Sequence, residues 1–144
     1  KDCTNGSSAA STNIWVELQA IKNGENIAKG KTVTGTVAEN SSYPYSNIVD
    51  GLIDTTNNGR SSDTGFQCIS VDLENTYDLD EIAVWHYYTD GRTYNNNVTY
   101  VSSDNSTWIP VIAENTAETS NGKRVNAYKW HLKDCAAKLQ SNLF

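Results

Sequence analysis

Short apolar stretches separated by polar turns recur along the whole chain, and several of them alternate between apolar and polar positions. In the clearest example, Ile69, Val71 and Leu73 alternate with Ser70 and Asp72. A period of two residues is that of a half-buried β-strand. The pattern predicts strands at Ile14–Ile21, Thr32–Val37, Gln67–Leu73, Glu81–Tyr88, Asn97–Ser102, Trp108–Ile112 and Lys123–Lys129.

Turn residues between these stretches strengthen the prediction of an antiparallel arrangement. The polar run Ser103–Ser106 predicts a hairpin loop, and Asp90-Gly91 predicts a turn. Near the end of the chain the spacing of apolar residues changes to a near-helical one, which predicts a short helix over Lys133–Leu143. Many short strands with one terminal helix indicate an all-β sandwich or barrel rather than an alternating α/β fold.

Composition and charge narrow the classes of partner. The chain has 144 residues, enough for one domain, and its 4 Trp and 8 Tyr are too many for a disordered chain. A net charge of −6 disfavours nucleic acid and anionic membranes as partners, because both attract basic surfaces. The longest apolar runs, such as Ile109 to Ala113, are too short to span a bilayer, so membrane insertion is not expected. The polar, Asn- and Thr-rich composition is typical of an extracellular protein.

Three cysteines leave two interpretations open. Cys3 and Cys135 lie near opposite ends, each within the tripeptide Lys-Asp-Cys, and Cys68 lies in an apolar stretch mid-chain. All three are reduced thiols, with Cys68 in the core, or else Cys3 and Cys135 form a disulfide within or between subunits. The absence of a Cys-x-x-Cys pair in the sequence disfavours a zinc site.

Four motifs in order resemble those of discoidin domains, the galactose-binding-like sandwiches of coagulation-factor C domains and bacterial carbohydrate-binding modules. They are Asn26–Lys31, Asn47–Gly51, Ile69–Leu73 and the strand–turn–Trp hairpin Val101–Trp108. The resemblance runs from Asn26 to about Lys129 and implies a galactose-binding-like β-sandwich of the jelly-roll type. The segment Val84–Tyr94 is also similar to discoidin-like repeats in phage tail and surface proteins of Gram-positive systems.

One departure from the family pattern concerns the last strand. Nothing like the usual final strand follows Lys129, whereas Trp15–Ile21 near the start resembles it. We therefore expect a circular permutation, with a discoidin-like sandwich over residues 1–132 and a tail, helical in part, over 133–144. The second Lys-Asp-Cys, Lys133–Cys135, stands where the strand of a further repeat would begin. Chance recurrence of the tripeptide combined with a truncated domain is the alternative.

The resemblance also implies a structural Ca²⁺ site. Calcium takes six to eight oxygen ligands, a mixture of carboxylates and carbonyls that an Asp-Gly turn is able to supply. The implied ligands are the carbonyls of Asn47, Leu52 and Val16, the carboxylates of Asp50 and Glu17, and Thr55. The alternative is a turn capped by Asp50 without a metal, with Asp54 as a solvated neighbour.

A candidate ligand surface follows from the polar and aromatic residues around the turn at Asp90. Sugars bind to aromatic faces with planar polar groups on their hydroxyls. Alternation places Val84 and His86 on one face of their strand and Trp85 on the other, so some of these residues must be core. The predicted ligand-binding residues are Arg92, Tyr94, His86 and Arg60.

Together these features predict a non-catalytic module that binds a glycan at the outside of a cell or on a phage virion or bacterial cell surface. Neither His86 nor His131 has a neighbouring nucleophile motif, which disfavours an enzyme. The alternative function is a structural decoration or fibre subunit that assembles with neighbouring copies through its termini, as a homo-oligomer, and does not bind sugar.

Overall fold

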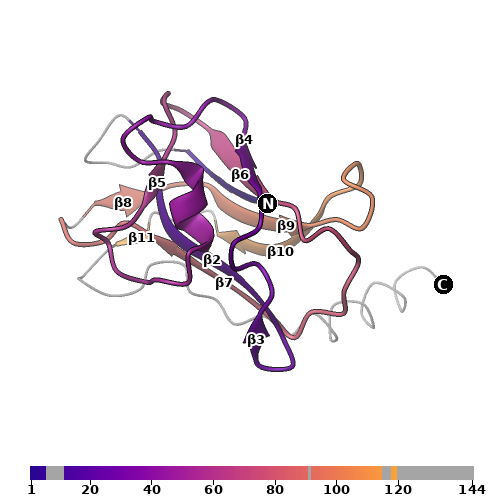
Figure 1. Cartoon of the computed structure of the whole chain (residues 1–144). Coiled ribbons are helices and arrows are strands. Elements are labelled where there is room, and N and C mark those ends of the chain that lie inside the picture. The colour runs from indigo at the N-terminus through magenta and orange to yellow at the C-terminus, as the bar shows by residue number, and fades with distance from the viewer. Residues whose placement is uncertain (6–11, 91, 115–117, 120–144) are drawn as a thin grey trace.

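The computed structural model describes residues 1–5, 12–90, 92–114 and 118–119, and these form mainly antiparallel β-structure (Figure 1). One 3-10 helix, η1 (Tyr45–Val49), interrupts the strands. The strands are β1 (Asp2–Thr4), β2 (Ile14–Lys22), β3 (Glu25–Asn26), β4 (Val33–Gly35), β5 (Gly59–Arg60), β6 (Gln67–Val71), β7 (Glu81–His86), β8 (Thr93–Tyr94), β9 (Asn97–Val101), β10 (Ile109–Glu114) and β11 (Glu118–Thr119).

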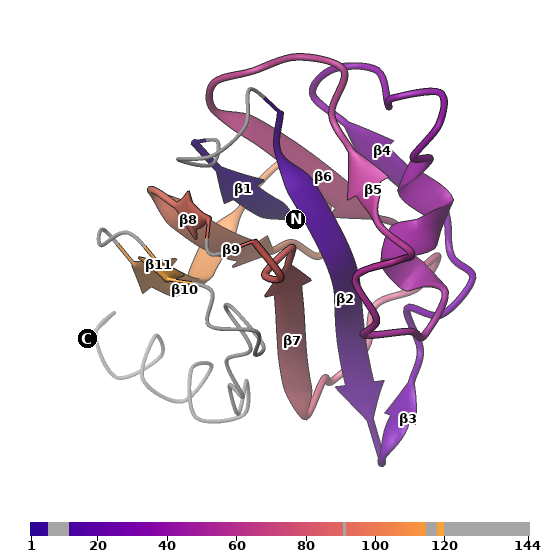
Figure 2. The same cartoon turned by 90° about the vertical axis from the view of Figure 1, so that its left-hand side faces the viewer.

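Two main sheets contain most of these strands. The larger has the order β10-β9-β1-β6-β4, so the first strand of the chain lies at its centre. In the other sheet β7 pairs along one edge of β2, while β5 and β3 pair with the two ends of its opposite edge (Figure 2). A small ribbon of β8 and β11 stands apart from both. The strand Ile14–Ile21 predicted from the sequence therefore pairs within its own chain.

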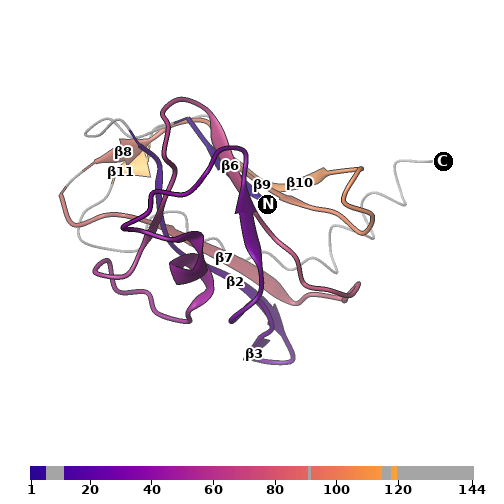
Figure 3. The same ribbon diagram turned by 45° about the horizontal axis from the view of Figure 1, so that its top comes forward.

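The two sheets pack face to face over one apolar core, which makes the protein an all-β sandwich (Figure 3). Trp15 and Leu18 of β2 and Val84 of β7 pack there against Ile69 of β6 and Val111 of β10. The helix η1 closes the core with Tyr45, Ile48 and Val49. Within the part of the chain that the structure describes, no helix combines the length and apolar character needed to cross a membrane.

The second face of β2 and β7 is covered as well. Val16, Ala83 and Trp85 form a separate apolar cluster there, with Tyr87 packed against it. Both faces of β7 are thus buried, which is why its sequence is almost continuously apolar. Because both faces are covered, the buried side chains of β7 are not accessible to a ligand.

The strands predicted from alternation are confirmed where the structure describes them, with shorter bounds at several ends. Thr32–Val37 contracts to β4, and Glu81–Tyr88 ends at His86. Ser103–Ser106 lies in the connection between the antiparallel strands β9 and β10, as predicted. The predicted strand Lys123–Lys129, the predicted helix Lys133–Leu143 and the tail 133–144 lie outside the described residues.

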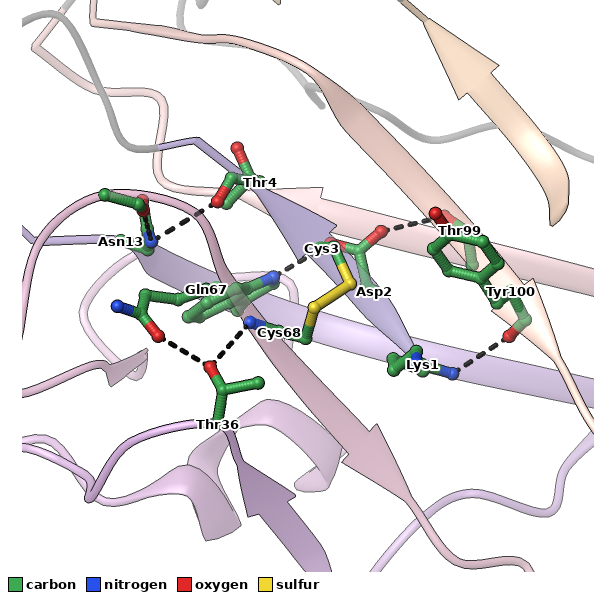
Figure 4. Close-up of a disulfide and its surroundings, with 12 residues drawn as sticks. Lys1, Asp2, Cys3, Thr4, Asn13, Thr36, Gln67, Cys68, Thr99 and Tyr100 are labelled. Carbon is green, nitrogen blue, oxygen red and sulfur yellow. Dashed lines mark hydrogen bonds between the residues drawn. A yellow bond between two sulfur atoms is a disulfide. The ribbon is translucent and has the colours of Figure 1, made fainter. Parts of the chain in front are cut away.

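A disulfide joins Cys3 to Cys68, so both predictions for the cysteines, a Cys3–Cys135 bridge and three reduced thiols, are wrong (Figure 4). The reason is the position of β1. It pairs antiparallel with β6 in a register that places Cys3 directly opposite Cys68, with their Cα atoms 4.0 Å apart. Cys135 lies outside the described residues.

Candidate functional site

A tight turn follows η1 and forms one half of the predicted cation site. The Asp50 carboxylate accepts a hydrogen bond from the Leu52 N–H at 2.7 Å, which holds the turn closed. Gly51 between them has a φ of +88°, in the region that favours glycine. The sequence Asp-Gly-Leu therefore orders this turn locally and fixes the position of the Asp50 carboxylate.

Glu17 of β2 reaches this turn from the neighbouring sheet. Its side chain is fully buried, and its Oε2 accepts a hydrogen bond from the Gly51 N–H at 3.3 Å. The other oxygen, Oε1, accepts hydrogen bonds from the amides of Gln19 (3.3 Å) and Asn26 (3.4 Å). The structure thus brings together Glu17 and the Asp50 turn, the two halves that the sequence predicts. Their role as cation ligands stays a prediction.

A β-bulge in β2 orients this part of the strand. Trp15 pairs with His86 and Glu17 pairs with Trp85, so Val16 is an extra residue on the β2 side. Because of this insertion Trp15 and Leu18, three positions apart, both reach the main core. Val16 and Glu17 are left outside the main core cluster.

Burial makes the charge of Glu17 costly. The pKa of Glu17 is raised to about 7, chiefly because burial removes solvation from the charged form, and the negative charge of Asp50 acts in the same direction. The hydrogen bonds from Gln19 and Gly51 and the positive charge of Lys29 act in the opposite direction. Lys29 is exposed, with its Nζ 3.2 Å from the position that a Cβ at residue 51 would take. The ionised form of Glu17 is therefore disfavoured in this site, and a bound cation would favour it.

The other predicted cation ligands are carbonyl and hydroxyl oxygens rather than further carboxylates. Leu52 is 48% exposed, in keeping with a residue that would contribute only its carbonyl. Among the described residues, no three His, Cys, Asp or Glu side chains gather into a metal-binding group. A cation here would be held by Glu17 and Asp50 together with carbonyl and hydroxyl oxygens from the 47–55 segment and Val16. Such an all-oxygen set suits Ca²⁺, so the donor chemistry fits the ion.

Asn58, which the sequence prediction missed, connects the cation turn to Arg60. Its buried side-chain amide donates to the Thr55 carbonyl at 2.9 Å, and its Oδ1 accepts a hydrogen bond from Arg60 Nε at 2.9 Å. Its main-chain carbonyl accepts a hydrogen bond from the Asn47 amide at 3.1 Å. The turn-like sequence from Asn57 to Arg60 indicates a loop but gives no sign of this connection.

Arg60 lies on a half-buried surface with Tyr43. The guanidinium carbon of Arg60 is 3.5 Å from the centre of the Tyr43 ring, a stacked cation–π arrangement. Gly59 beside it allows β5 to approach η1 closely, because a Cβ at this position would lie 2.5 Å from Ile48. Arg60 therefore remains a candidate for ligand contact, held in place by Asn58 and Tyr43.

For the other three predicted ligand-binding residues the prediction of an accessible surface is wrong. His86 and Tyr94 are completely buried and stack on each other, with ring centres 4.6 Å apart. Arg92 is 7% exposed, and its Nε donates to the Asp90 carboxylate at 2.8 Å. The physical reason is that His86 faces the interior on the same side of β7 as Val84, where β1 and Tyr94 cover it.

Asp2 is the polar partner in that interior. Its carboxylate accepts hydrogen bonds from Trp15 Nε1 and from Thr99 Oγ1, each at 2.8 Å, and lies 3.0 Å from His86 Nε2. Asp2 itself is 1% exposed. A buried carboxylate is tolerated when several donors satisfy it, and here they come from β2, β7 and β9. This cluster joins four strands and is a structural feature rather than a binding site.

In comparisons with known proteins, no family model, no curated protein and no solved structure matches this chain. The resemblance to discoidin domains therefore stays a prediction from its motifs.

Proposed function

We propose that this chain is a non-catalytic binding module of the galactose-binding-like, jelly-roll type, circularly permuted, with a structural Ca²⁺ ion and a glycan as its ligand. Its place would be extracellular, on a phage virion or a bacterial cell surface. One observation carries the proposal: the fully buried Glu17 of β2 reaches the Asp50–Gly51 turn, which lies 34 positions further along the chain. A buried carboxylate beside the charge of a second, half-buried one favours a bound cation.

The proposed ion would be structural. It would connect β2 to the segment that follows η1, and it would stabilise the folded state because the unfolded chain does not assemble the site. Extracellular modules bind Ca²⁺ in roughly the 10⁻⁴–10⁻³ M range, which matches the concentration expected outside cells. The weak hydrogen bonds of Glu17, at 3.3 to 3.4 Å, would be replaced in part by metal ligation.

The glycan contact is proposed at Arg60 and Tyr43. A guanidinium stacked on an aromatic ring presents planar donors, which suit pairs of sugar hydroxyls, next to an apolar face. Asn58 connects this pair to the carbonyl of Thr55, within the proposed cation segment. Ordering of that segment by a cation would therefore also order Arg60.

Binding rather than catalysis is proposed because His86 is committed to the interior. It is buried and lies within hydrogen-bonding distance of Asp2, with Tyr94 stacked on it. A general base must reach the proton that it removes from a substrate, and His86 has no access to one. His131 lies outside the described residues.

A glycan array with the Ca²⁺-loaded protein tests the proposal, followed by calorimetry on the bound sugars. Arg60→Ala should lower the affinity at least tenfold if Arg60 forms charge-assisted hydrogen bonds to the sugar. Lys31→Ala is the matched control, because it removes a partly exposed cation that pairs with Glu74 instead. If the folded, Ca²⁺-loaded protein binds no glycan, the proposed ligand is refuted. If Arg60→Ala and the wild type bind a glycan with equal affinity, the proposed contact at Arg60 is refuted.

A further inference from the structure

Every residue of the first tripeptide, Lys1-Asp2-Cys3, has specific contacts within the larger sheet (Figure 4). The main-chain nitrogen of Lys1 donates to the Tyr100 carbonyl at 2.9 Å, and its Nζ lies 4.1 Å from the centre of the Trp108 ring. Asp2 accepts the hydrogen bonds of the buried cluster, and Cys3 forms the disulfide with Cys68. The space between β6 and β9 that holds these residues, here called the β1 slot, therefore offers partners to a lysine, an aspartate and a cysteine in that order.

The same tripeptide occurs once more in the sequence, as Lys133-Asp134-Cys135. We propose that Lys133–Cys135 of one copy of this chain enters the β1 slot of a second copy and pairs there with β6 and β9. The partner is thus another copy of the same chain. This proposal develops the alternative function of a self-assembling surface subunit, and it does not depend on calcium or glycan binding.

The polar chemistry of the slot supports a repeat of this kind. An incoming strand without a carboxylate at the position of Asp2 would leave the buried donors of Trp15 and Thr99 unpaired, which is costly. Asp134 supplies the carboxylate, Lys133 a cation for the rings of Tyr100 and Trp108, and Cys135 a thiol opposite Cys68. Exchange of an identical element between protomers is a low-cost route to assembly, because the incoming strand restores the interactions of the strand that it replaces.

The exchange of one strand for the other includes a thiol–disulfide exchange, which needs no oxidant. When β1 detaches from its neighbours, the Cys135 thiolate of the second copy attacks Sγ of Cys68, the Cys3–Cys68 bond breaks and a Cys68–Cys135 bond forms. Cys3 leaves as a thiolate and takes a proton from water, so the number of disulfides is unchanged. Because the bonds are equivalent, the extent of exchange depends on protein concentration. The strand of the same chain is favoured in dilute solution, and that of a neighbour where copies are crowded.

The decisive experiment uses Cys3→Ser, which leaves Cys68 without its partner. Equal amounts of ¹⁵N-labelled and unlabelled protein are mixed at high concentration with oxidised glutathione, which accepts the two electrons as it is reduced to two thiols. We expect disulfide-linked multimers, and mass spectrometry of the digested protein should show Cys68–Cys135 peptides that combine the two isotopes. Cys68–Cys135 peptides without mixed isotopes would place the bond within one chain and overturn assembly between copies.

A change of Asp134, the residue before Cys135, distinguishes pairing in the β1 slot from unspecific oxidation of the two thiols. Asp134→Ala in the Cys3→Ser background should slow formation of the mixed peptide about tenfold, because it removes the acceptor for the buried donors. Asp78→Ala, an exposed carboxylate, is the matched control and should not change the rate. Equal rates for all three proteins would overturn the proposal.

A second measurement covers the case in which Cys3→Ser fails to fold. The wild-type protein is incubated with a synthetic peptide of residues 131–137 at a pH where its thiol is partly ionised. We expect the peptide to become attached to Cys68, and the same peptide with Ala in place of Asp134 to attach about tenfold more slowly. Attachment that does not depend on the aspartate, or no attachment, would overturn the proposal.

Discussion

The imidazole Nε2 of His86 lies 3.0 Å from Oδ2 of Asp2, although the two residues are 84 positions apart. The exposed fractions of these residues are 0% and 1%. The carboxylate of Asp2 also accepts the hydrogen bonds of Trp15 and Thr99, so this single residue connects the beginning of the chain to three other strands. The strand β1 therefore belongs to the core of the sandwich despite its length of three residues.

Replacing Asp2 should destabilise the protein strongly. Asp2→Asn keeps the shape of the side chain but replaces one acceptor oxygen by an NH₂ group that faces donors. We expect a loss of about 3 kcal/mol in the free energy of unfolding, typical of breaking a buried charged cluster. Urea unfolding measures it. Asp78→Asn, on the surface, should change stability by less than about 0.5 kcal/mol, and equal stabilities of the two variants would contradict the role of Asp2.

Removing the disulfide should have a comparable effect. Cys3 and Cys68 are separated by 65 residues, and closing a loop of that size in the unfolded chain stabilises the folded state by about 4 kcal/mol in the chain-entropy treatment. We expect Cys68→Ser to lower the melting temperature and Cys135→Ser to leave it unchanged. Thermal unfolding of the two variants, at low protein concentration and without added thiol reagent, provides the comparison. A larger drop for Cys135→Ser would show that the bridge lies elsewhere.

The stability of the metal-free protein should decrease as the pH rises towards neutrality. Glu17 has a pKa of about 7 in the folded chain against an ordinary value of 4.5, so the folded state binds the proton more tightly. The free energy of unfolding therefore falls between about pH 4.5 and 7, because over this range Glu17 ionises in the unfolded chain while the folded chain still holds the proton.

Glu17→Gln removes this contribution. With a chelator present, the variant should lose less stability than the wild type over that pH range, while Glu25→Gln, at an exposed site, should follow the wild type. Urea unfolding at a series of pH values provides the comparison. Parallel curves for Glu17→Gln and wild type would show that Glu17 does not titrate in this range.

Asn58 should couple the cation segment to the proposed sugar contact. Asn58→Ala removes the bonds to Thr55 and to Arg60 Nε, so we expect glycan affinity to fall several-fold even with Ca²⁺ present. Calorimetry with a bound glycan measures the change. The neighbouring Asn57→Ala is the control and should retain affinity. If Asn58→Ala binds as wild type does, Arg60 is positioned by Tyr43 alone.

Much of the sandwich is predictable because long strands show their burial in the sequence. The alternation of Ile69, Val71 and Leu73 locates β6, and the bulged β2 is visible as an apolar run. By contrast β1, β3 and β5 have two or three residues each, too few to establish a period. Only pairing with neighbours defines them, and the pairing of β1 with β6 also decides the disulfide, which the spacing of cysteines leaves open.

The candidate site was predictable in part for a related reason. The Asp-Gly turn is a local feature, and its connection to Glu17 followed from the family resemblance of two separate motifs. Alternation correctly groups His86 with Val84, but it does not say which face of a strand is covered. Because β1 arrives from the start of the chain to cover His86, its burial depends on a contact between distant residues that no local pattern contains.

The most direct test of the central proposal is the effect of Ca²⁺ on thermal unfolding, compared between chelator and millimolar Ca²⁺. Asp54, an exposed carboxylate of the same loop, provides the control through Asp54→Asn. For wild type and Asp54→Asn we predict a rise in melting temperature of roughly 1–5 °C, because 1 mM Ca²⁺ at a Kd of about 10⁻⁴–10⁻³ M stabilises the folded state by about 0.4–1.4 kcal/mol. Glu17→Gln and Asp50→Asn should lose most of that rise. An unchanged melting temperature of the wild-type protein, or the same rise in Glu17→Gln, would contradict a cation bound between Glu17 and the Asp50 turn.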